Sequence, residues 1–486
     1  MLRSRVTDRT TDEGFALYQK ARVELWNTVA SAPSPRNLSR YYHERLADLY
    51  RFRIPEGSRV IELGSGNGDL LAALRPSRGV GIDFSEEMVR IAQERHPELE
   101  FLQADVHDLD LSEPFDYVVL SDLVNDLWDV QAVLERVAAL CTPDTRIIVN
   151  FYNKLWQSPL GVARRTGFAD PLLPQNWLTV QDVANLLHLA GFEVVTTAGE
   201  VLWPVATPLL TRIFNRYVVK FWPFTSLALT EFIVARPRPG RSRAEERELT
   251  VSVVVPARNE AGNIQAILDR VPQMGAGTEL IFVEGNSTDD TYEVIERLLA
   301  ERGDDTVTLL QQPGRGKGDA VRFGFAHATG DVLMILDADL TVAPEDLPRF
   351  YRAIVDGTGD FINGVRLVYP MEGEAMQFLN LLGNKFFGIV FSWLLRQPVR
   401  DTLCGTKVLS RDAYDVIVEN RAYFGDFDPF GDFDLLFGAA KANMKIIDMP
   451  VRYRDRTYGS TNIDRWRHGV LLLRMSAFAA RRLRFI

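Results

Sequence analysis

Short apolar runs, each followed at once by glycine or by acidic residues, recur along the chain. The run at 60–63 stops before a glycine-rich stretch, and the run at 332–336 stops before two aspartates. Neither run has the spacing of an amphipathic helix, so each predicts a strand buried on both faces. Helical stretches separate such runs, and this alternation predicts α/β units with mostly parallel sheets.

A charged stretch rich in proline and glycine divides the runs into two series. Residues 238–248 cannot bury a core, so they predict a hinge or tether between independent units. We therefore expect one domain at 1–237 and a second domain at 249–486.

The composition is that of a globular protein with material for two or three cores. Of the 486 residues, 46% are apolar and 25% are charged. A net charge of −10 argues against nucleic acid as a partner. Two cysteines far apart in the sequence fit a reducing compartment better than a disulfide framework. No signal peptide and no run long enough to span a membrane are visible, so we expect a cytoplasmic protein.

Two carboxylates, Asp337 and Asp339, follow the buried run at 332–336. Open α/β sheets bind ligands at the carboxyl ends of their strands, which is where this pair falls. Carboxylate oxygens suit Mg²⁺ or Mn²⁺, and these ions bridge diphosphates. A strand-end turn with solvated acids is the alternative, but the motifs around this pair favour the metal site.

Glu62 lies within the first run, and Gly64, Gly66 and Gly68 form the glycine-rich stretch that follows it. Asp69 stands where the NAD-binding motif has its third glycine, which argues against NAD. The pattern instead resembles motif I of the class I methyltransferases that use S-adenosylmethionine, which have a Rossmann-like fold. Later runs, to about residue 237, resemble the family's following motifs. The resemblance implies that this cofactor is bound by Glu62, Gly64, Gly66, Gly68, Asp83 and Asp105.

Methyl transfer chiefly requires alignment of the nucleophile with the methyl group, and it requires a base only if the nucleophile carries a proton. Asp122, near the end of the fourth run, is our candidate catalytic residue, whereas we expect His107 to be structural. The aromatic insertion at 203–224 predicts packing, with the edge of a lid. No motif identifies the methyl acceptor. Further candidates near the acceptor are Asn125, Asp126, Tyr41, Tyr42 and His43.

The second half has runs at 250–255, 279–283 and 307–311 before the one at 332–336. Their order and end motifs resemble the family 2 glycosyltransferases of the GT-A fold, close to polyprenyl-phosphate sugar synthases such as dolichyl-phosphate mannose synthase. The resemblance covers about 249–470 and implies inverting transfer from a nucleotide-sugar. It places the nucleotide-sugar at Pro256, Arg258, Glu260, Glu284, Lys317 and Asp337, and the metal at Asp337 and Asp339.

The later motifs of the second half correspond to the acceptor side of that family. Asp432 and Asp434 precede an apolar helical stretch, so helix capping is the alternative role for either of them. The sequence at 284–286 departs from the family's Asp-Asp-Gly and leaves the nucleobase open, and Thr341 replaces a glutamine metal ligand. We expect acceptor-binding residues Arg366, Lys407, Arg454 and Arg456, and catalytic residues Asp401, Asp432 and Asp434.

Nine arginines and two aspartates fall in the last 36 residues of a chain that is acidic overall. Residues 470–486 mix apolar side chains with arginine. They suit either a helix lying on an anionic membrane surface or an ordinary docking helix with a basic face. Both interpretations stay open, and the membrane contact would be peripheral, at the inner face.

The two resemblances together predict a bifunctional enzyme. We expect inverting, metal-dependent sugar transfer to a polyprenyl phosphate or a related lipid or glycan. We also expect S-adenosylmethionine-dependent methylation of a glycan-related substrate. The alternatives are a soluble sugar acceptor, or a methyltransferase-like domain that serves only as a binding module. The sequence identifies neither the donor sugar nor the order of the two steps.

Overall fold

The computed structural model forms two compact units, Met1–Arg238 with Phe485–Ile486, and Pro239–Arg484. Each unit has its own sheet and its own core. The residues that the structure describes are 9–30, 37–166, 173–239, 248–366, 378–424, 433–454, 458 and 465–486.

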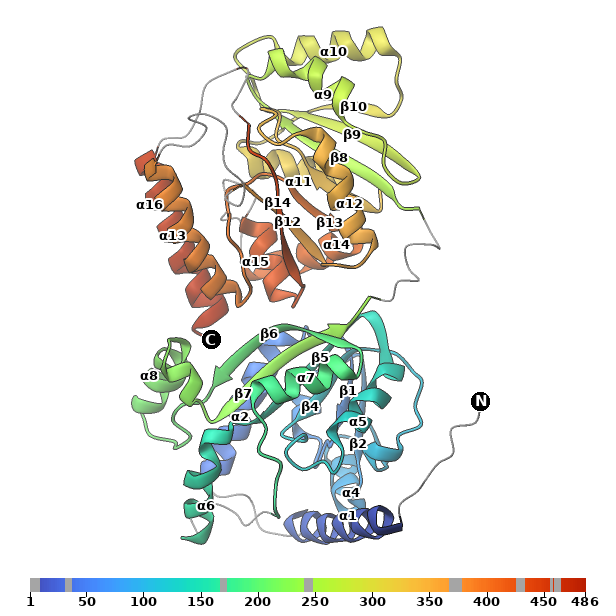
Figure 1. The fold of residues 1–486 in the computed structure, drawn as a ribbon, viewed down its shortest axis with the longest axis vertical. Coiled ribbons are helices and arrows are strands. Elements are labelled where there is room, and N and C mark those ends of the chain that lie inside the picture. The colour runs from blue at the N-terminus through green and yellow to red at the C-terminus, as the bar shows by residue number, and fades with distance from the viewer. Residues whose placement is uncertain are drawn as a thin grey trace. The chain divides into compact units, whose positions relative to one another are not determined.

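A seven-stranded sheet forms the middle layer of the first unit, in the order β3-β2-β1-β4-β5-β7-β6 (Figure 1). Its neighbouring strands are parallel except for β7, which runs antiparallel to β5 and β6. The strands are β1 Arg59–Leu63, β2 Arg78–Asp83, β3 Glu100–Gln103, β4 Phe115–Ser121, β5 Cys141–Tyr152, β6 Phe192–Glu200 and β7 Thr230–Pro237.

Helices cover both faces of this sheet. Helices α5 and α7 pack on one face through Val133 and Leu187, and α2, α3 and α4 pack on the other through Leu49, Leu71 and Ala92. The helices are α1 Arg9–Ala30, α2 Asn37–Arg53, α3 Asp69–Ala73, α4 Glu86–Arg95, α5 Val130–Val137, α6 Gln157–Arg165, α7 Val180–Leu189 and α8 Leu210–Arg216.

Register brings the carboxyl ends of β1, β2 and β4 to one edge of the first sheet. Leu63 pairs with Ile82 on one side and with Leu120 on the other. The N–H of Gly64 donates to the carbonyl of Ile82 at 2.7 Å, which extends the pairing into the turn. The residues that follow these strands therefore share one edge, as open α/β sheets require for a ligand site.

The second unit also contains a seven-stranded sheet, in the order β10-β9-β8-β11-β13-β12-β14 (Figure 1). Strand β13 runs antiparallel to β11 and β12, so this sheet is mixed as well. The strands are β8 Thr250–Ala257, β9 Gly277–Glu284, β10 Val307–Gln311, β11 Val332–Ile335, β12 Phe361–Val365, β13 Lys407–Ser410 and β14 Ile446–Pro450.

Helices α9, α10 and α12 cover one face of the second sheet through Ile267, Ile295 and Phe350. Helix α11 packs closely on the other face, where a side chain at Gly324 would come within 2.4 Å of Val254. The helices are α9 Ile264–Arg270, α10 Thr291–Arg302, α11 Lys317–His327, α12 Leu347–Val355, α13 Phe378–Leu395, α14 Arg411–Glu419, α15 Phe433–Lys441 and α16 Arg465–Ala479.

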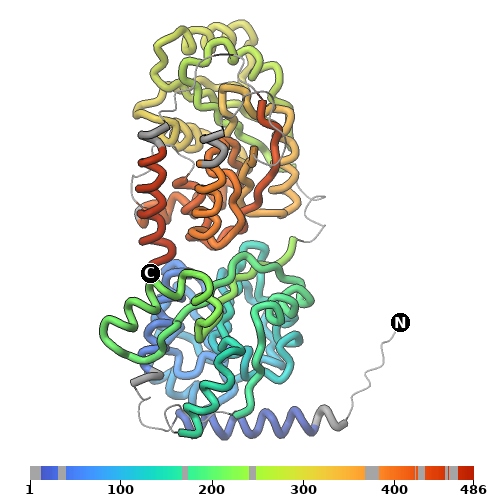
Figure 2. Tube along the Cα trace, turned by 60° about the vertical axis from the view of Figure 1, so that its left-hand side comes forward, coloured from blue at the N-terminus to red at the C-terminus, as the bar shows by residue number. Residues whose placement is uncertain are grey.

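Helices α13 and α16 lie side by side in the second unit (Figures 1 and 2). In the described part of the chain, no helix combines the length and the apolar character needed to cross a membrane. The predicted α/β fold of both halves is confirmed. Both sheets are mostly parallel, as the alternation of strands and helices predicts, and the antiparallel strands β7 and β13 are the exceptions.

The insertion at 203–224 differs from its prediction. Most of its large apolar side chains are exposed, including Leu209 at 70% and Trp222 at 83%. The prediction that this segment packs is therefore wrong for those side chains. Apolar content alone does not decide on which side of the backbone a side chain faces.

Candidate active sites

The glycine-rich turn after β1 has a backbone that side chains would obstruct. Gly64, Gly66 and Gly68 have φ values of +73°, +51° and +77°, a region that glycine adopts without strain. A side chain at Gly64 would lie 2.8 Å from Leu123, and one at Gly68 would lie 2.5 Å from Phe101. Gly64 and Gly68 therefore pack the turn against Leu123 and Phe101, whereas Gly66 has open space beside it.

Two predicted cofactor-binding acids lie at this turn. The Asp83 carboxylate accepts the N–H of Gly66 and the N–H of Ser85, both at 2.9 Å. Burial raises the pKa of Asp83, and these two hydrogen bonds partly offset the effect. Burial also raises the pKa of Glu62, whose Oε2 is buried and has no hydrogen-bond partner in the described structure. An unpartnered carboxylate oxygen beneath the turn fits a ligand that supplies a donor.

The third predicted acid, Asp105, is covered by α1. Its Oδ2 accepts Nε2 of Gln19 on α1 at 2.6 Å, and its Oδ1 lies 2.7 Å from Nδ1 of His107. Burial raises the pKa of Asp105, but these hydrogen bonds outweigh burial and hold the pKa below its ordinary value. The structural role expected of His107 stays a prediction.

Asp122 follows β4 in a strained backbone conformation, with φ +53°. Its Oδ1 accepts the hydroxyl of Tyr42 at 3.0 Å and Nδ2 of Asn150 at 2.6 Å. Burial raises the pKa of Asp122 to about 7, against these two hydrogen bonds. Leu123, the next residue, touches Gly64, so Asp122 lies beside the glycine-rich turn. A carboxyl that titrates near neutrality can accept a proton from a substrate.

The other predicted acceptor residues of the first unit have separate surroundings. Asn125 is buried, and its side chain holds the backbone of Asn176 and Tyr152. Asp126 is ion-paired with Arg22 at 3.4 Å. Tyr41 accepts a hydrogen bond from Asn215, and burial lowers the pKa of His43. Among these predicted residues, Tyr42 on α2 contacts Asp122 through its hydroxyl.

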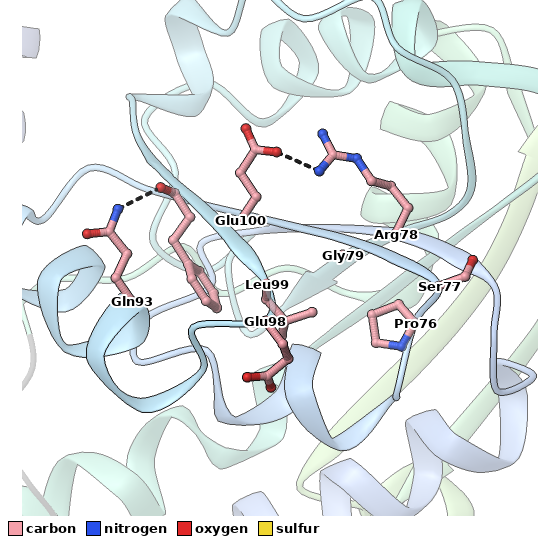
Figure 3. Close-up of a pocket in the computed structure, with 9 residues that line it drawn as sticks. Pro76, Ser77, Arg78, Gly79, Gln93, Glu98, Leu99 and Glu100 are labelled. Carbon is pink, nitrogen blue, oxygen red and sulfur yellow. Dashed lines mark hydrogen bonds and ion pairs between the residues drawn. The ribbon is translucent and has the colours of Figure 1, made fainter.

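A hollow of about 430 Å³ lies away from these residues, at the amino ends of β2 and β3 (Figure 3). Figure 3 shows Arg78 pointing toward Glu100. Nη1 of Arg78 and Oε2 of Glu100 are 2.5 Å apart, and Gln93 donates to the carbonyl of Phe101 at 3.1 Å. Because the glycine-rich turn lies at the opposite ends of the strands, we do not include this hollow in the candidate site.

In the second unit, Asp337 follows β11 and forms an ion pair with Lys317, with Nζ and Oδ1 2.6 Å apart. Burial raises the pKa of Asp337, but Lys317, Lys407 and Arg366 outweigh burial and lower the pKa. A side chain at Gly405 would come within 1.9 Å of the Asp337 carboxylate, so the loop before β13 approaches this acid through glycine.

Asp339 is held by Thr341, which the sequence marks as a departure from the family pattern. The Thr341 hydroxyl and N–H donate to Oδ1 of Asp339 at 2.7 and 3.1 Å. The carbonyl of Thr341 accepts the N–H of Arg454 at 3.0 Å, and Val342 pairs with Tyr453. Thr341 therefore orients one carboxylate and anchors the segment that carries Arg454.

Two of the four predicted acceptor residues are engaged within the protein. Arg366 forms a two-pronged ion pair with Asp401, at 2.7 and 2.9 Å, over the ring of Tyr453. Burial raises the pKa of Asp401, but Arg366 outweighs it and the pKa is lowered. Lys407 is fully buried and donates to the carbonyl of Cys404. Their acceptor role, and the catalytic role of Asp401, stay predictions.

The predicted nucleotide residues lie around the ends of β8 and β9. Glu284 is buried, and its Oε1 accepts the N–H of Ser287 at 2.6 Å. Glu260 accepts Nδ2 of Asn263 at 2.7 Å. Arg258 is exposed and Pro256 is half-buried. The structure thus places these residues at the carboxyl edge of the sheet, and their nucleotide contacts stay predictions.

Asp434 lies in the first turn of α15 against two arginines. Its Oδ2 is 3.3 Å from Nε of Arg421 and 3.7 Å from Nη1 of Arg322. The predicted residues Asp432 and Arg456 lie outside the described residues. Within the residues that the structure describes, no group of three His, Cys, Asp or Glu converges as a metal site. The metal role of Asp337 and Asp339 stays a prediction.

The structure adds site residues that sequence reasoning missed. Gln19 and Arg22 on α1 contact Asp105 and Asp126, and Thr341 orients Asp339. Gln19 and Arg22 belong to no motif, so the sequence offers no signal for them. Thr341 was visible only as a departure from the family pattern.

The folds and the edges described above define a chain of two transferase domains. Residues 252–417 match the family model for glycosyl transferase family 2, and residues 36–197 match the model for a methyltransferase domain. An uncharacterised glycosyltransferase of Mycobacterium tuberculosis is 31% identical over 219 residues, which cover 44% of this chain and 89% of that protein. The chain belongs to the family 2 glycosyltransferases and joins this domain to an N-terminal methyltransferase domain, as predicted.

Further similarities concern about half of the chain at a time. Glycosyltransferase AglJ of Haloferax volcanii is 29% identical, over 46% of this chain and 69% of that protein. The structure of magnesium protoporphyrin IX methyltransferase from Synechocystis, with bound SAH, has a TM-score of 0.32 and 16% identity, over 45% of this chain and 95% of that one. The structure of glucosyl-3-phosphoglycerate synthase from Mycobacterium tuberculosis has a TM-score of 0.36 and 19% identity, over 50% of this chain and 82% of that one.

Proposed function

We propose that the chain is a bifunctional enzyme of lipid-linked glycan chemistry. Its second unit transfers a sugar from a nucleotide-sugar to a polyprenyl phosphate, with inversion and a divalent ion. Its first unit uses S-adenosylmethionine to methylate a glycan-related substrate. The observation that carries sugar transfer is the Lys317–Asp337 pair at the carboxyl end of β11, in a chain of this glycosyltransferase family. Residues 238–248 act as the linker between domains at 1–237 and 249–486.

The residues at the end of β11 fit a hard divalent ion. Asp337 stays ionised because neighbouring cations lower its pKa, and Thr341 holds Asp339 by one oxygen. Two carboxylates leave the remaining positions to diphosphate and water, as is common for Mg²⁺. When bound, such an ion stabilises the negative charge of the leaving diphosphate. Lys317 would neutralise further charge at the same place.

The cations of the second unit suit a phosphate acceptor. A phosphate monoester has its second pKa at about 6, so at neutral pH it is largely ionised and needs cations rather than a base. Arg454 is exposed and anchored beside Thr341, and we assign it and Arg456 to the phosphate, supported by the charges of Arg366 and Lys407. A hydroxyl acceptor would need Asp432 or Asp434 as its base, and Asp434 faces two arginines.

A lipid acceptor requires a surface that can approach a bilayer. Ile389 of α13 is 73% exposed, and Val470 and Leu473 of α16 are also exposed. Arg474 is exposed on α16, and Arg481 and Arg482 are exposed just after it. Apolar and basic side chains on neighbouring helices support peripheral contact at the inner face of the membrane, in the cytoplasm.

In the first unit, the glycine-rich turn with Glu62, Asp83 and Asp105 would hold S-adenosylmethionine, which supplies an activated methyl group when bound. The unpartnered Oε2 of Glu62 and the open space at Gly66 support this assignment. We assign Asp122 the role of base for an acceptor hydroxyl. Tyr42 and Asn150 fix its carboxylate, and its pKa of about 7 lets it take the proton.

The test uses the full-length chain with a polyprenyl phosphate, a panel of nucleotide-sugars, and Mn²⁺ or Mg²⁺. We expect a lipid-linked sugar whose formation stops in excess EDTA, while calorimetric binding of S-adenosylmethionine continues. Transfer that persists in EDTA would overturn the metal assignment. Efficient transfer to a soluble hydroxyl, without any lipid product, would overturn the acceptor assignment.

A further inference from the structure

The first unit carries an exposed apolar surface that neither proposed reaction uses. Between Trp203 and Leu227, ten large apolar side chains are exposed, and we call them the apolar platform (around α8 in Figure 1). Trp222 is 83% exposed and Leu209 is 70% exposed. Exposed apolar side chains gathered in one segment of the chain indicate an interaction site.

The polar side chains of the same segment face inward. Asn215 is buried, and its side chain binds both the N–H and the carbonyl of Trp203 at 2.7 Å. Lys220 is buried in an ion pair with Glu200, which also lies 3.4 Å from Arg53. This arrangement inverts the usual order of apolar inside and polar outside. Buried polar anchors thus present the platform on an ordered scaffold.

Further hydrogen bonds tie the end of the segment to the body of the first unit. Trp156 donates its indole N–H to the carbonyl of Leu227 at 2.9 Å, and Asn153 donates to the carbonyl of Ser226 at 3.1 Å. The N–H of Leu229 donates to the carbonyl of Val201 at 2.8 Å. The platform is therefore held at both ends.

The charge of residues 201–230 favours an anionic partner. Residues 201–230 contain no acidic residue, in a chain of net charge −10, and of their three basic residues Lys220 is already neutralised by Glu200. Arg212 is exposed beside the apolar side chains, and Arg216 is half-buried. Aromatic residues together with arginine suit the interface of a bilayer, where rings enter the headgroup region and cations meet anionic lipid.

We propose that the apolar platform docks the methyltransferase unit on an anionic lipid bilayer. Leu209, Phe221, Trp222 and Phe224 enter the interface, and Arg212 lies at the headgroups. The contact is peripheral, and its residues differ from those proposed for the contact through α13 and α16. It would hold the methyltransferase unit at the surface where a lipid-linked substrate resides.

The test measures co-sedimentation of the full-length chain with vesicles of phosphatidylglycerol and phosphatidylcholine in equal parts. The paired variant Leu209→Ser/Trp222→Ser should bind roughly tenfold or more weakly, because two large apolar side chains no longer leave water. The matched control is Leu17→Ser/Leu189→Ser, which changes side chains that are 70% and 55% exposed elsewhere on the same unit. This control should bind like the unmodified chain.

A second measurement reports on the platform itself. Brominated lipid in the same vesicles should quench part of the tryptophan emission, and Trp222→Phe should remove that quenched part. Pure phosphatidylcholine vesicles should bind more weakly, since Arg212 then lacks an anionic headgroup.

Three results would overturn the proposal. One is equal binding by the platform and control variants. Another is loss of all vesicle binding in an Arg481→Gln/Arg482→Gln variant, together with normal binding by the platform variant. The membrane contact would then lie at the end of α16 and not at the platform. The third is a self-association in light scattering that only the platform variant abolishes, without vesicle binding, because the occupant would then be a second copy.

Discussion

Two carboxylates of the first unit, Asp83 and Asp122, and two of the second unit, Asp337 and Asp401, have opposite electrostatic surroundings. In the first unit, Asp83 and Asp122 are held by backbone N–H groups or neutral side chains, and burial raises the pKa of both. In the second unit, Asp337 and Asp401 face Lys317 and Arg366, which outweigh burial and lower the pKa. Desolvation raises the pKa of these acids in both units, so the partners of each acid decide its charge.

This difference matches the chemistry proposed for each unit. Acids without a cationic partner can face a cationic sulfonium or exchange a proton near neutrality. Acids that are paired with lysine and arginine stay ionised. The same lysines and arginines are held in fixed positions, where they can bind the polyanionic nucleotide-sugar. The next four predictions change one side of this comparison at a time.

Replacing Arg366 with methionine should produce the largest effect. The substitution leaves Asp401 buried without a compensating charge, so the free energy of unfolding should fall by about 3–5 kcal/mol. Urea denaturation followed by circular dichroism measures it, and Arg366→Met/Asp401→Leu should recover most of the loss. The control Arg270→Met breaks the exposed pair with Glu345 and should cost under about 1 kcal/mol. Equal losses for both arginines would contradict the role of burial.

Replacing Asp83 with alanine tests the first unit. The carboxylate would lose its hydrogen bonds to the ribose of S-adenosylmethionine, and the binding free energy should weaken by about 1.5–3 kcal/mol. Calorimetry on the full-length chain measures the affinity. The control Asp108→Ala removes an acid whose side chain is 76% exposed, and it should bind normally. Unchanged affinity in Asp83→Ala would remove this acid from the site.

Replacing Thr341 with valine keeps the shape of the side chain and removes the donor to Asp339. Sugar transfer should fall roughly tenfold, which corresponds to about 1.4 kcal/mol. The apparent affinity for Mn²⁺ should fall as well, because the carboxylate is no longer oriented. Thr341→Ser should restore both quantities. If serine and valine behave alike, the hydroxyl does not position Asp339.

The smallest effect concerns pH and Asp122. Its pKa in the folded protein is about 7 against an ordinary 3.8, so the folded state keeps a proton that the unfolded chain loses. The unfolding free energy of the first unit should therefore fall as pH rises from about 4 to about 7. Asp122 is half-buried, so we expect its share to be about 1 kcal/mol or less after screening by water.

Urea denaturation at several pH values, with the Asp122→Asn variant as reference, isolates this contribution. Tyr42, Tyr50 and Tyr152 face Asp122, and burial raises the pKa of all three, so they stay neutral over this range. If the unfolding free energies of the unmodified chain and of Asp122→Asn change with pH in the same way, Asp122 does not titrate between about pH 4 and 7. The paired acids of the second unit contribute a pH dependence of the opposite sign. Their stabilisation of the folded state is lost as pH falls below about 4.

The sequence by itself determined the strands and the residues at their ends. The apolar runs predicted β1 and β11, and the glycines and acids that follow them lie at the carboxyl edges as expected. Periodicity and turn chemistry are local properties, and a strand carries the residues that follow it to one edge of its sheet. The antiparallel course of β13 and the exposure of the insertion at 203–224 were not visible in the same patterns.

Only the tertiary structure decided which groups those acids meet. Asp401 pairs with Arg366 across 35 positions, and Asp105 meets Gln19 across 86. The charge state of an acid depends on such partners and on burial, because desolvation and nearby cations shift a pKa in opposite directions. Neither quantity is encoded in a local pattern, since both depend on how distant segments pack. The local sequence pattern therefore predicted where the candidate sites lie, whereas the packing of distant segments sets the charge of their acids.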